Sequence, residues 1–210
     1  MIDFQKSTEF KGLDFSKLVG ACESCTRCDL SKTRTNVVVG SGPVPCNLMI
    51  IGEAPGEKED LEGRPFVGKS GQLLTQILGS AGIDREKGVY IANTVKCRPP
   101  KNRDPQASEI ESCTPFLIRQ VELIQPKVLI LLGNPSLKTI LGSAFTITKS
   151  RGKWFKAPVS YMADPLYIMP MFHPAYLLRN QSQKKGRPKW LTLADAKEIK
   201  AALDYYQMSV

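Results

Sequence analysis

Four short, largely apolar runs constrain the fold of this chain more than any other feature of its sequence. They are LMIIG at 48–52, VYIANTV at 89–95, VLILL at 128–132 and LYIMPM at 166–171. Each has the length and composition of a buried strand. Amphipathic stretches of helical length lie between and after them, at 72–81, 107–124, 134–142 and 192–206. Strands that alternate with helices predict a three-layer α/β/α fold around a central, mainly parallel four-stranded sheet.

Polar residues mark where the predicted helices begin. Ser108 is followed three positions later by Glu111, the spacing of a capping box, and Thr192 and Asp195 have the same spacing. Asn134 is a residue type that caps helices well. These residues set the expected starts of the last three helices.

Length and composition predict one intracellular domain with a basic surface. We expect an irregular, poorly ordered segment at 1–14 and one domain over 15–210, opening with a short helix at 15–24. No run is long enough to cross a membrane, and the N-terminus lacks the apolar region of a signal peptide, so we expect a cytoplasmic protein. The formal net charge of +9 favours nucleic acid as a partner.

Six cysteines and a single histidine limit the metal chemistry that the chain can support. In a cytosolic protein, cysteines in this number indicate metal or redox chemistry rather than structural disulfides. Cys25 and Cys28 form a C-x2-C pair, and Cys97 and Cys113 follow downstream. Four thiolates suit a [4Fe–4S] cluster or a structural zinc ion, and the spacing does not separate the two. We expect Cys46 to be a buried free thiol.

A glycine-rich loop follows the first predicted strand, where open α/β sheets bind their ligands. Its segment GRPFVGKS, 63–70, formally matches the phosphate-binding P-loop pattern. However, Gly63 follows an acidic run rather than the strand itself, and Pro65 removes a backbone N–H that a phosphate cradle would use. We therefore expect the loop to form one wall of a pocket, with Phe66 as an apolar ring inside it. The alternative is a long connection that Phe66 pins to the core.

Three strands deliver an unusual polar group at or near their carboxyl ends: Glu53, Asn93 and His173. In a parallel sheet these ends share one edge, so the three side chains are expected to converge. Taken alone, Asn93 could make a structural hydrogen bond, and His173 could be a core histidine whose hydrogen bonds are all made within the protein. The convergence of all three favours a binding site.

The motifs GEAPG–GRPFVGKSGQLL, NTVKCRPP and HPAYLL, in this order and spacing, resemble the uracil-DNA glycosylase superfamily. The iron–sulfur-containing family 4 enzymes match best, over roughly residues 20–205. The resemblance implies a glycosylase that flips uracil out of DNA and hydrolyses its N-glycosidic bond in base-excision repair. It implies uracil-containing DNA, single- or double-stranded, as the partner of a monomer that does not bind membranes. The implied uracil-binding residues are Gly52, Glu53, Ala54, Phe66, Asn93 and His173.

The resemblance also implies roles for these residues. The Asn93 amide would read the N3–H and O4 of uracil, Phe66 would stack on the base, and His173 would donate to O2. The catalytic residues would be His173 and Glu53. Family 1 enzymes carry a water-activating aspartate where this chain has Ala54. Glu53 is our choice for orienting water, and the other local acids, Glu57, Glu59 and Asp60, are expected to be solvated loop charges.

For the cluster, the resemblance selects Cys25, Cys28, Cys97 and Cys113 as ligands of a [4Fe–4S] group, because CTRCDLSKTRT has the family's C-x2-C context. Cys22 and Cys25 also form a C-x2-C pair, so Cys22 remains an alternative ligand. The cluster would hold the basic loop 96–103 beside DNA.

Two further basic loops are expected to contact DNA phosphates, at 149–153 and 179–189. A leucine after HPAY would fill the gap left by the flipped base, and the sequence does not choose between two candidates. The implied DNA-binding residues are Lys149, Arg151, Leu177, Leu178, Arg179, Lys184 and Lys185. Two alternatives lack turnover: a protein that binds uracil-DNA, and an iron–sulfur DNA-binding module associated with replication.

Overall fold

The structure, a computed structural model, describes residues 2–4, 9–159 and 165–208. These residues form a five-stranded sheet in the order β2-β1-β3-β5-β4. All neighbouring strands are parallel except β4 and β5. The predicted fold class is confirmed. The strands are β1 (Leu48–Gly52), β2 (Tyr90–Asn93), β3 (Val128–Leu132), β4 (Phe155–Ala157) and β5 (Leu166–Met171).

The edge strand β4 was not predicted, so the expected count of four strands is one too low. Its three residues pair antiparallel with β5, and Phe155 packs edge-on against Phe145 with ring centroids 5.4 Å apart. A strand this short has too few residues to show an alternating pattern. The pairing therefore arises from the neighbouring strand rather than from a local signal.

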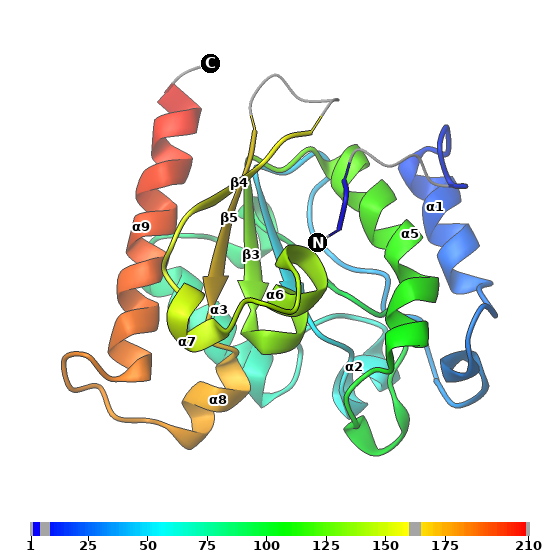
Figure 1. Ribbon diagram of the computed structural model, residues 1–210, viewed down its shortest axis with the longest axis horizontal. Helices are drawn as coiled ribbons and strands as arrows, with labels where there is room; N and C mark the ends of the chain where they lie inside the picture. The colour runs from blue at the N-terminus through cyan, green and yellow to red at the C-terminus, as the bar shows by residue number, and fades with distance from the viewer. Residues whose placement is uncertain (1, 5–8, 160–164, 209–210) are drawn as a thin grey trace.

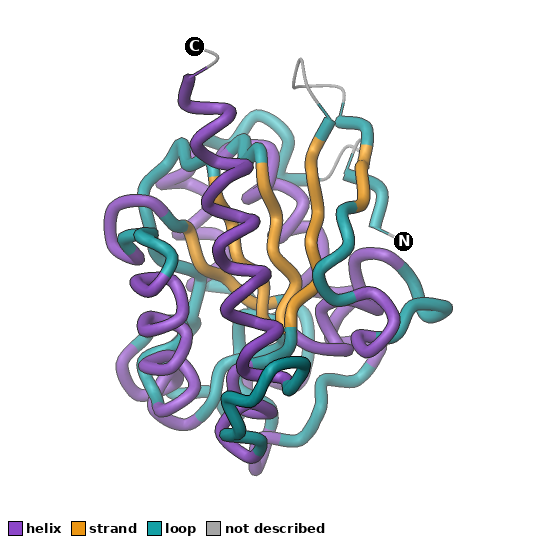
Figure 2. Tube along the Cα trace, turned by 90° about the vertical axis from the view of Figure 1, so that its left-hand side faces the viewer, coloured by secondary structure: helices purple, strands orange, loops and turns teal. Residues whose placement is uncertain are grey.

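Helices cover both faces of the sheet (Figures 1 and 2). α3 and α9 lie over one face, α5 and α6 lie over the other, and α1 packs outside α5. The apolar sides of these helices bury the strands, whose side chains are almost fully buried in β1, β2 and β3. The principal helices are α1 (Phe15–Glu23), α3 (Lys69–Ser80), α5 (Ala107–Ile124), α6 (Gly133–Leu141) and α9 (Pro188–Met208). The shorter ones are η1 (Asp29–Lys32), α2 (Glu57–Glu62), α4 (Arg85–Gly88), η2 (Pro100–Asn102), α7 (Ile147–Ser150) and α8 (Pro174–Arg179).

The predicted capping residues are wrong at three helices, although α5 has the expected bounds and α6 begins within one residue of its expected start. α5 is capped by Gln106, which forms a capping box with Glu109, so Ser108 lies inside the helix. Asn134 also lies inside its helix, and its Oδ1 accepts a hydrogen bond from the Ile147 amide at 2.8 Å. Thr192 and Asp195 lie within α9, which begins at Pro188.

The loop after β1 contains the short helix α2, which was not predicted. Asp60 on this helix is 2% exposed and accepts hydrogen bonds from the amides of Thr35 and Asn36. Glu59 accepts from the amides of Val67 and Gly68 at 2.9 and 2.8 Å. Two of the expected solvated loop charges are therefore structural. A carboxylate on these amides also leaves no phosphate cradle, which agrees with rejecting the P-loop interpretation.

The N-terminal segment contributes to the core. Phe4 is 4% exposed within the main hydrophobic cluster, and the Ile2 amide donates to the Ile140 carbonyl at 2.9 Å. Its described residues, 2–4 and 9–14, form no helix or strand, and residues 1 and 5–8 of the predicted segment lie outside the described part of the chain. Within the described residues, no helix is both long enough and apolar enough to cross a membrane.

Candidate functional site

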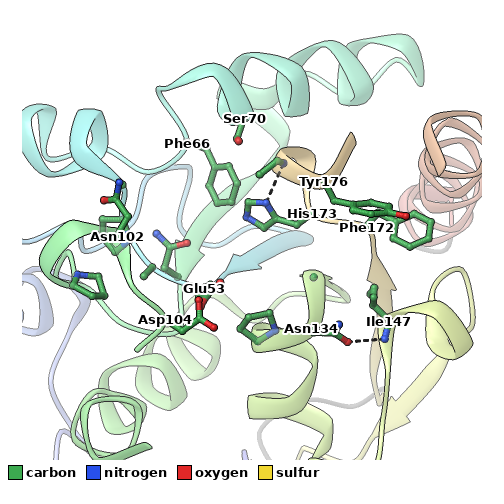
Figure 3. A pocket seen from close by; sticks show the side chains of 18 of the residues that line it. Glu53, Phe66, Ser70, Asn102, Asp104, Asn134, Ile147, Phe172, His173 and Tyr176 are labelled. Atoms are coloured by element: carbon green, nitrogen blue, oxygen red, sulfur yellow. Dashed lines mark hydrogen bonds between the residues drawn. The ribbon is translucent and has the colours of Figure 1, made fainter. Parts of the chain in front are cut away.

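A cleft of about 800 Å³ opens at the carboxyl ends of the parallel strands. The register places Gly52 beside Asn93, and Leu132 beside Met171. The segments that follow these strand ends therefore meet at one edge of the sheet (Figure 3). The predicted residues Glu53, Ala54, Phe66, Asn93 and His173 all line the cleft.

Gly52 lies against two of these residues. A Cβ at this position would be 2.4 Å from Asn93 Oδ1 and 2.7 Å from the Phe66 ring. Only a glycine leaves room for both side chains. The structure thus brings together all six residues that the sequence indicated for base binding.

Asn93 presents a buried acceptor that the described residues leave unpaired. Its side chain is 1% exposed, and its Oδ1 has no hydrogen-bond partner among the described residues. A buried polar atom without a partner costs about 1–3 kcal/mol. A ligand with a matching N–H would remove that cost, so the geometry favours a recognition role over a structural hydrogen bond for this oxygen.

Phe66 is held in a strained backbone conformation. Its φ of 54° is left-handed, and the ring centroid lies 5.8 Å from that of His173. Glu59 fixes the following two amides, and a Cβ at Gly71 would be 1.7 Å from the Phe66 carbonyl oxygen. Strain of this kind persists where the surrounding structure overdetermines it, often at ligand sites.

His173 is held as a neutral imidazole. Burial, and then the charge of Arg179, lower its pKa to about 4. Its Nδ1 accepts a hydrogen bond from the Ala175 amide at 3.1 Å (Figure 3). In a neutral ring the other nitrogen must then carry the proton. Nε2 is therefore the hydrogen-bond donor that His173 offers to a ligand.

Glu53 is the acid with the most altered environment. Burial, followed by the nearby Asp104 carboxyl, raises the pKa of Glu53 to about 7. Its Oε1 is buried without a hydrogen-bond partner among the described residues, and Figure 3 shows Asp104 beside it. Glu57, by contrast, is exposed and lies 3.7 Å from Arg98. Asp104 was not identified from the sequence, because an aspartate in a polar loop carries no distinguishing pattern.

Five cysteines line a second, small cavity between α1, α5 and the segment after β2. They are Cys22, Cys25, Cys28, Cys97 and Cys113. Cys97 Sγ also accepts a hydrogen bond from Arg34 Nη1 at 3.2 Å. Within the described residues, no three His, Cys, Asp or Glu side chains form a finished metal site. The donor set nevertheless fits an iron–sulfur group, because it gathers at least four thiols in one place. Cys46 lies elsewhere and is a buried free cysteine, as expected.

The basic residues expected at DNA divide into two groups. Lys149, Arg179, Lys184 and Lys185 are exposed, and Arg179 lines the cleft. Arg151 instead forms an ion pair with Asp195, whose side chain is only 3% exposed. This arrangement favours a structural role for Arg151.

The two leucines expected to fill the gap left by a flipped base also differ. Leu177 is 1% exposed and belongs to the core, whereas Leu178 is half-buried. The placement favours Leu178 of the two.

Basic side chains of the loop 96–103 make contacts within the protein that were not expected. Lys96 is 1% exposed, and its Nζ donates to the Asn93 carbonyl at 2.8 Å. Arg103 forms two hydrogen bonds with Glu109, at 2.9 and 2.6 Å. Lys96 therefore does not face DNA, and charge alone gave no indication of this.

The family model for the uracil-DNA glycosylase superfamily matches residues 39–197. The chain belongs to the uracil-DNA glycosylase superfamily. A Type-4 uracil-DNA glycosylase from Thermotoga maritima is 44% identical over 180 residues, covering 85% of this chain and 89% of the relative. A Type-4 uracil-DNA glycosylase from Sulfurisphaera tokodaii is 46% identical, covering 77% of this chain and 74% of the relative. A Type-5 uracil-DNA glycosylase from Pyrobaculum aerophilum is 30% identical, covering 77% and 74%.

These similarities confirm the resemblance to family 4. The superfamily match spans the strand ends that form the cleft, together with Cys97 and Cys113. Cys25 and Cys28 lie N-terminal to that match.

The histidine environment gives a prediction that does not depend on activity. His173 is the single histidine in the chain, so its imidazole NMR signals need no assignment. Because burial disfavours the charged ring, the signals should stay those of the neutral Nε2–H tautomer as the pH falls from about 8 to about 5.5, where free histidine gains its proton. The urea-unfolded protein should titrate normally over this range. A folded-state midpoint near 6.5 would contradict the assignment.

Proposed function

We propose that this protein is a type-4 uracil-DNA glycosylase, which extrudes uracil from DNA and hydrolyses its N-glycosidic bond to leave an abasic site in base-excision repair. The observation that carries the proposal is the buried Asn93 amide, whose Oδ1 has no partner among the described residues and which lines the cleft with Phe66 and His173. The similar Type-4 proteins support it. We retain the expectation of a cytoplasmic monomer.

Recognition of uracil rests on the pattern of donors and acceptors along the base edge. Uracil presents an N3–H donor beside the O4 acceptor, and cytosine presents the reverse. Asn93 Oδ1 accepts from N3–H while its amide nitrogen donates to O4. Phe66 stacks on the extruded ring, the usual way in which a flipped base is held. The backbone amides of Glu53 and Ala54 complete the contacts to the carbonyl oxygens.

Cleavage separates charge between the sugar and the base. The C1′–N1 bond breaks, its electron pair leaves with uracil, and a cation-like sugar remains. Nε2–H of His173 donates to O2 and stabilises the negative charge as it develops. Water then adds to C1′, and the Glu53 carboxylate accepts the proton that the water loses. A carboxyl with a pKa of about 7 is well matched to this step near neutral pH.

DNA is held through the exposed cations around the cleft. Lys149, Arg179, Lys184 and Lys185 contact phosphates, and Leu178 enters the space that the flipped base leaves. Arg151 supports this surface from beneath through Asp195. The binding is independent of sequence and weakens with salt.

The cofactor in this proposal is a [4Fe–4S] cluster held by Cys25, Cys28, Cys97 and Cys113. The four thiols come from three separate segments that meet at the small cavity, and Arg34 donates a hydrogen bond to one of them. The cluster crosslinks these segments when bound, so it supports the loop after β2 rather than the chemistry. Cys22 is 1% exposed at the same cavity and remains the alternative to Cys28.

The excision assay uses a labelled oligonucleotide with one uracil, followed by alkali and a denaturing gel. Wild-type protein should cleave the strand at uracil with many turnovers. A denaturant-resistant shifted band would instead indicate covalent trapping, for which the loop after β2 has no histidine. An unchanged strand would leave only a uracil-DNA binding protein.

Changing Asn93 to Asp tests base recognition. Asn93→Asp should lower uracil excision by roughly a hundredfold or more and permit some cytosine excision, because the buried donor and acceptor no longer match uracil. The matched control is Asn102→Asp, an exposed amide that lines the same cleft. The control variant should keep the preference for uracil over cytosine. If the Asn93 variant also keeps that preference, Asn93 does not have its proposed role.

Replacing single cysteines tests the cluster. Cys97→Ala should lose iron and the brown colour, because an iron–sulfur cluster needs its four thiolates. The control is Cys46→Ala, a buried cysteine outside the cavity, which should keep both. Comparing Cys22→Ala with Cys28→Ala identifies the remaining ligand. Zinc in a colourless wild-type protein would contradict the assignment.

A further inference from the structure

The first turn of α8 presents its side chains in an unexpected way. Leu177 points into the core, and Leu178 is half-buried, but Tyr176 is 38% exposed and lines the cleft. Tyrosine is enriched at binding interfaces, because its ring is apolar while its hydroxyl can hydrogen-bond. Tyr176 is therefore the large side chain of this turn that faces outward into the cleft.

Tyr176 is backed by a rigid support. Its ring lies 5.2 Å from that of Phe172, tilted by 38°, and Phe172 is 8% exposed (Figure 3). The Arg151 guanidinium, which pairs with Asp195, lies 6.0 Å from the centroid of the Phe172 ring. The backbone is also fixed, since the Tyr176 amide donates to the His173 carbonyl at 2.9 Å. The Tyr176 ring is thus an aromatic plate held against a buried ring.

This aromatic plate is continuous with the base pocket. Figure 3 shows His173 between Phe66 on one side and Phe172 and Tyr176 on the other, and all four residues line the same cleft as Asn93. Its volume of about 800 Å³ is far more than a single pyrimidine ring needs. Arg179, on the next turn of the same helix, adds positive charge at this end. An occupant with an aromatic face and a neighbouring anionic group fits these features.

We propose that the Tyr176 ring is a stacking site for the nucleobase next to the extruded uracil. Every base has an aromatic face, so stacking tolerates any sequence, and the Arg179 guanidinium is placed for the linking phosphate. The inference rests on the proposed glycosylase function and adds a second base subsite to it. It also assigns a role to a residue other than the leucines that follow it.

The first test compares single substitutions on a single-stranded uracil oligonucleotide. Tyr176→Ala should lower kcat/KM about tenfold, the order expected for the loss of one base–aromatic stack. Tyr176→Phe keeps the ring and should stay within about twofold of wild type. Tyr205→Ala removes an aromatic ring that is 70% exposed on α9 and is the matched control. Equal activity of wild type and Tyr176→Ala would overturn the proposal.

The decisive test removes the neighbouring base from the substrate instead. A tetrahydrofuran abasic analogue replaces the nucleotide 5′ or 3′ of uracil in two separate oligonucleotides. At one of these positions wild type should lose about as much kcat/KM as Tyr176→Ala loses on the intact strand, and the variant should lose little more. If the loss caused by Tyr176→Ala and the loss caused by removing the neighbouring base multiply at both positions, the two groups act independently. Tyr176 then acts only through the fold, and the stacking site is refuted.

The outcomes separate this inference from the function on which it rests. A wild-type protein that excises no uracil from the intact strand would refute the glycosylase function. A wild-type protein that excises uracil while Tyr176→Ala shows no coupling to either neighbouring base would refute the stacking site alone.

Discussion

The parallel register that sets Gly52 beside Asn93, and Leu132 beside Met171, determines where the strand-end residues of the cleft lie. It brings the ends of three strands to one edge, so that Glu53, Asn93 and His173 converge without any long-range contact of their own. The missing side chain at Gly52 completes the arrangement, because a Cβ there would collide with Asn93 and with the Phe66 ring. The pocket is thus a consequence of strand pairing, and the loops only complete its walls.

A second constraint joins the pocket to the cysteine cavity. Lys96 lines that cavity, and its buried Nζ donates to the carbonyl of Asn93. A fully buried ammonium needs such partners, because removing it from water is costly. The position of the Asn93 backbone therefore depends on packing around the cysteines. This gives a physical route by which a group bound among the cysteines would support base recognition.

The sequence predicted what depends on local pattern. The apolar runs located β1, β3 and β5 at their observed bounds and made β2 too long by up to two residues at each end. The polar groups at or just after the ends of β1, β2 and β5 identified Glu53, Asn93 and His173. The failures arise from contacts between distant segments. Asp195 looked like part of a helix cap, but it lies inside α9 and pairs with Arg151, 44 positions earlier. Lys96 looked like a DNA contact until folding buried it. The edge strand β4 exists only because β5 offers it a partner.

Burial is the largest cause of two opposite pKa shifts, at the two residues proposed to be catalytic. It lowers the pKa of His173 to about 4 and raises that of Glu53 to about 7, because a low-dielectric site disfavours both charged forms. Near neutral pH the histidine is then a neutral donor, while a useful fraction of the glutamate is ionised and able to accept a proton. An imidazolium at His173 would disturb this balance, since its charge would lower the pKa of the carboxyl and weaken it as a base. The cations proposed to hold DNA therefore disturb Glu53 least where they are exposed, because water screens their charge. Lys149, Lys184 and Lys185 are exposed in this way.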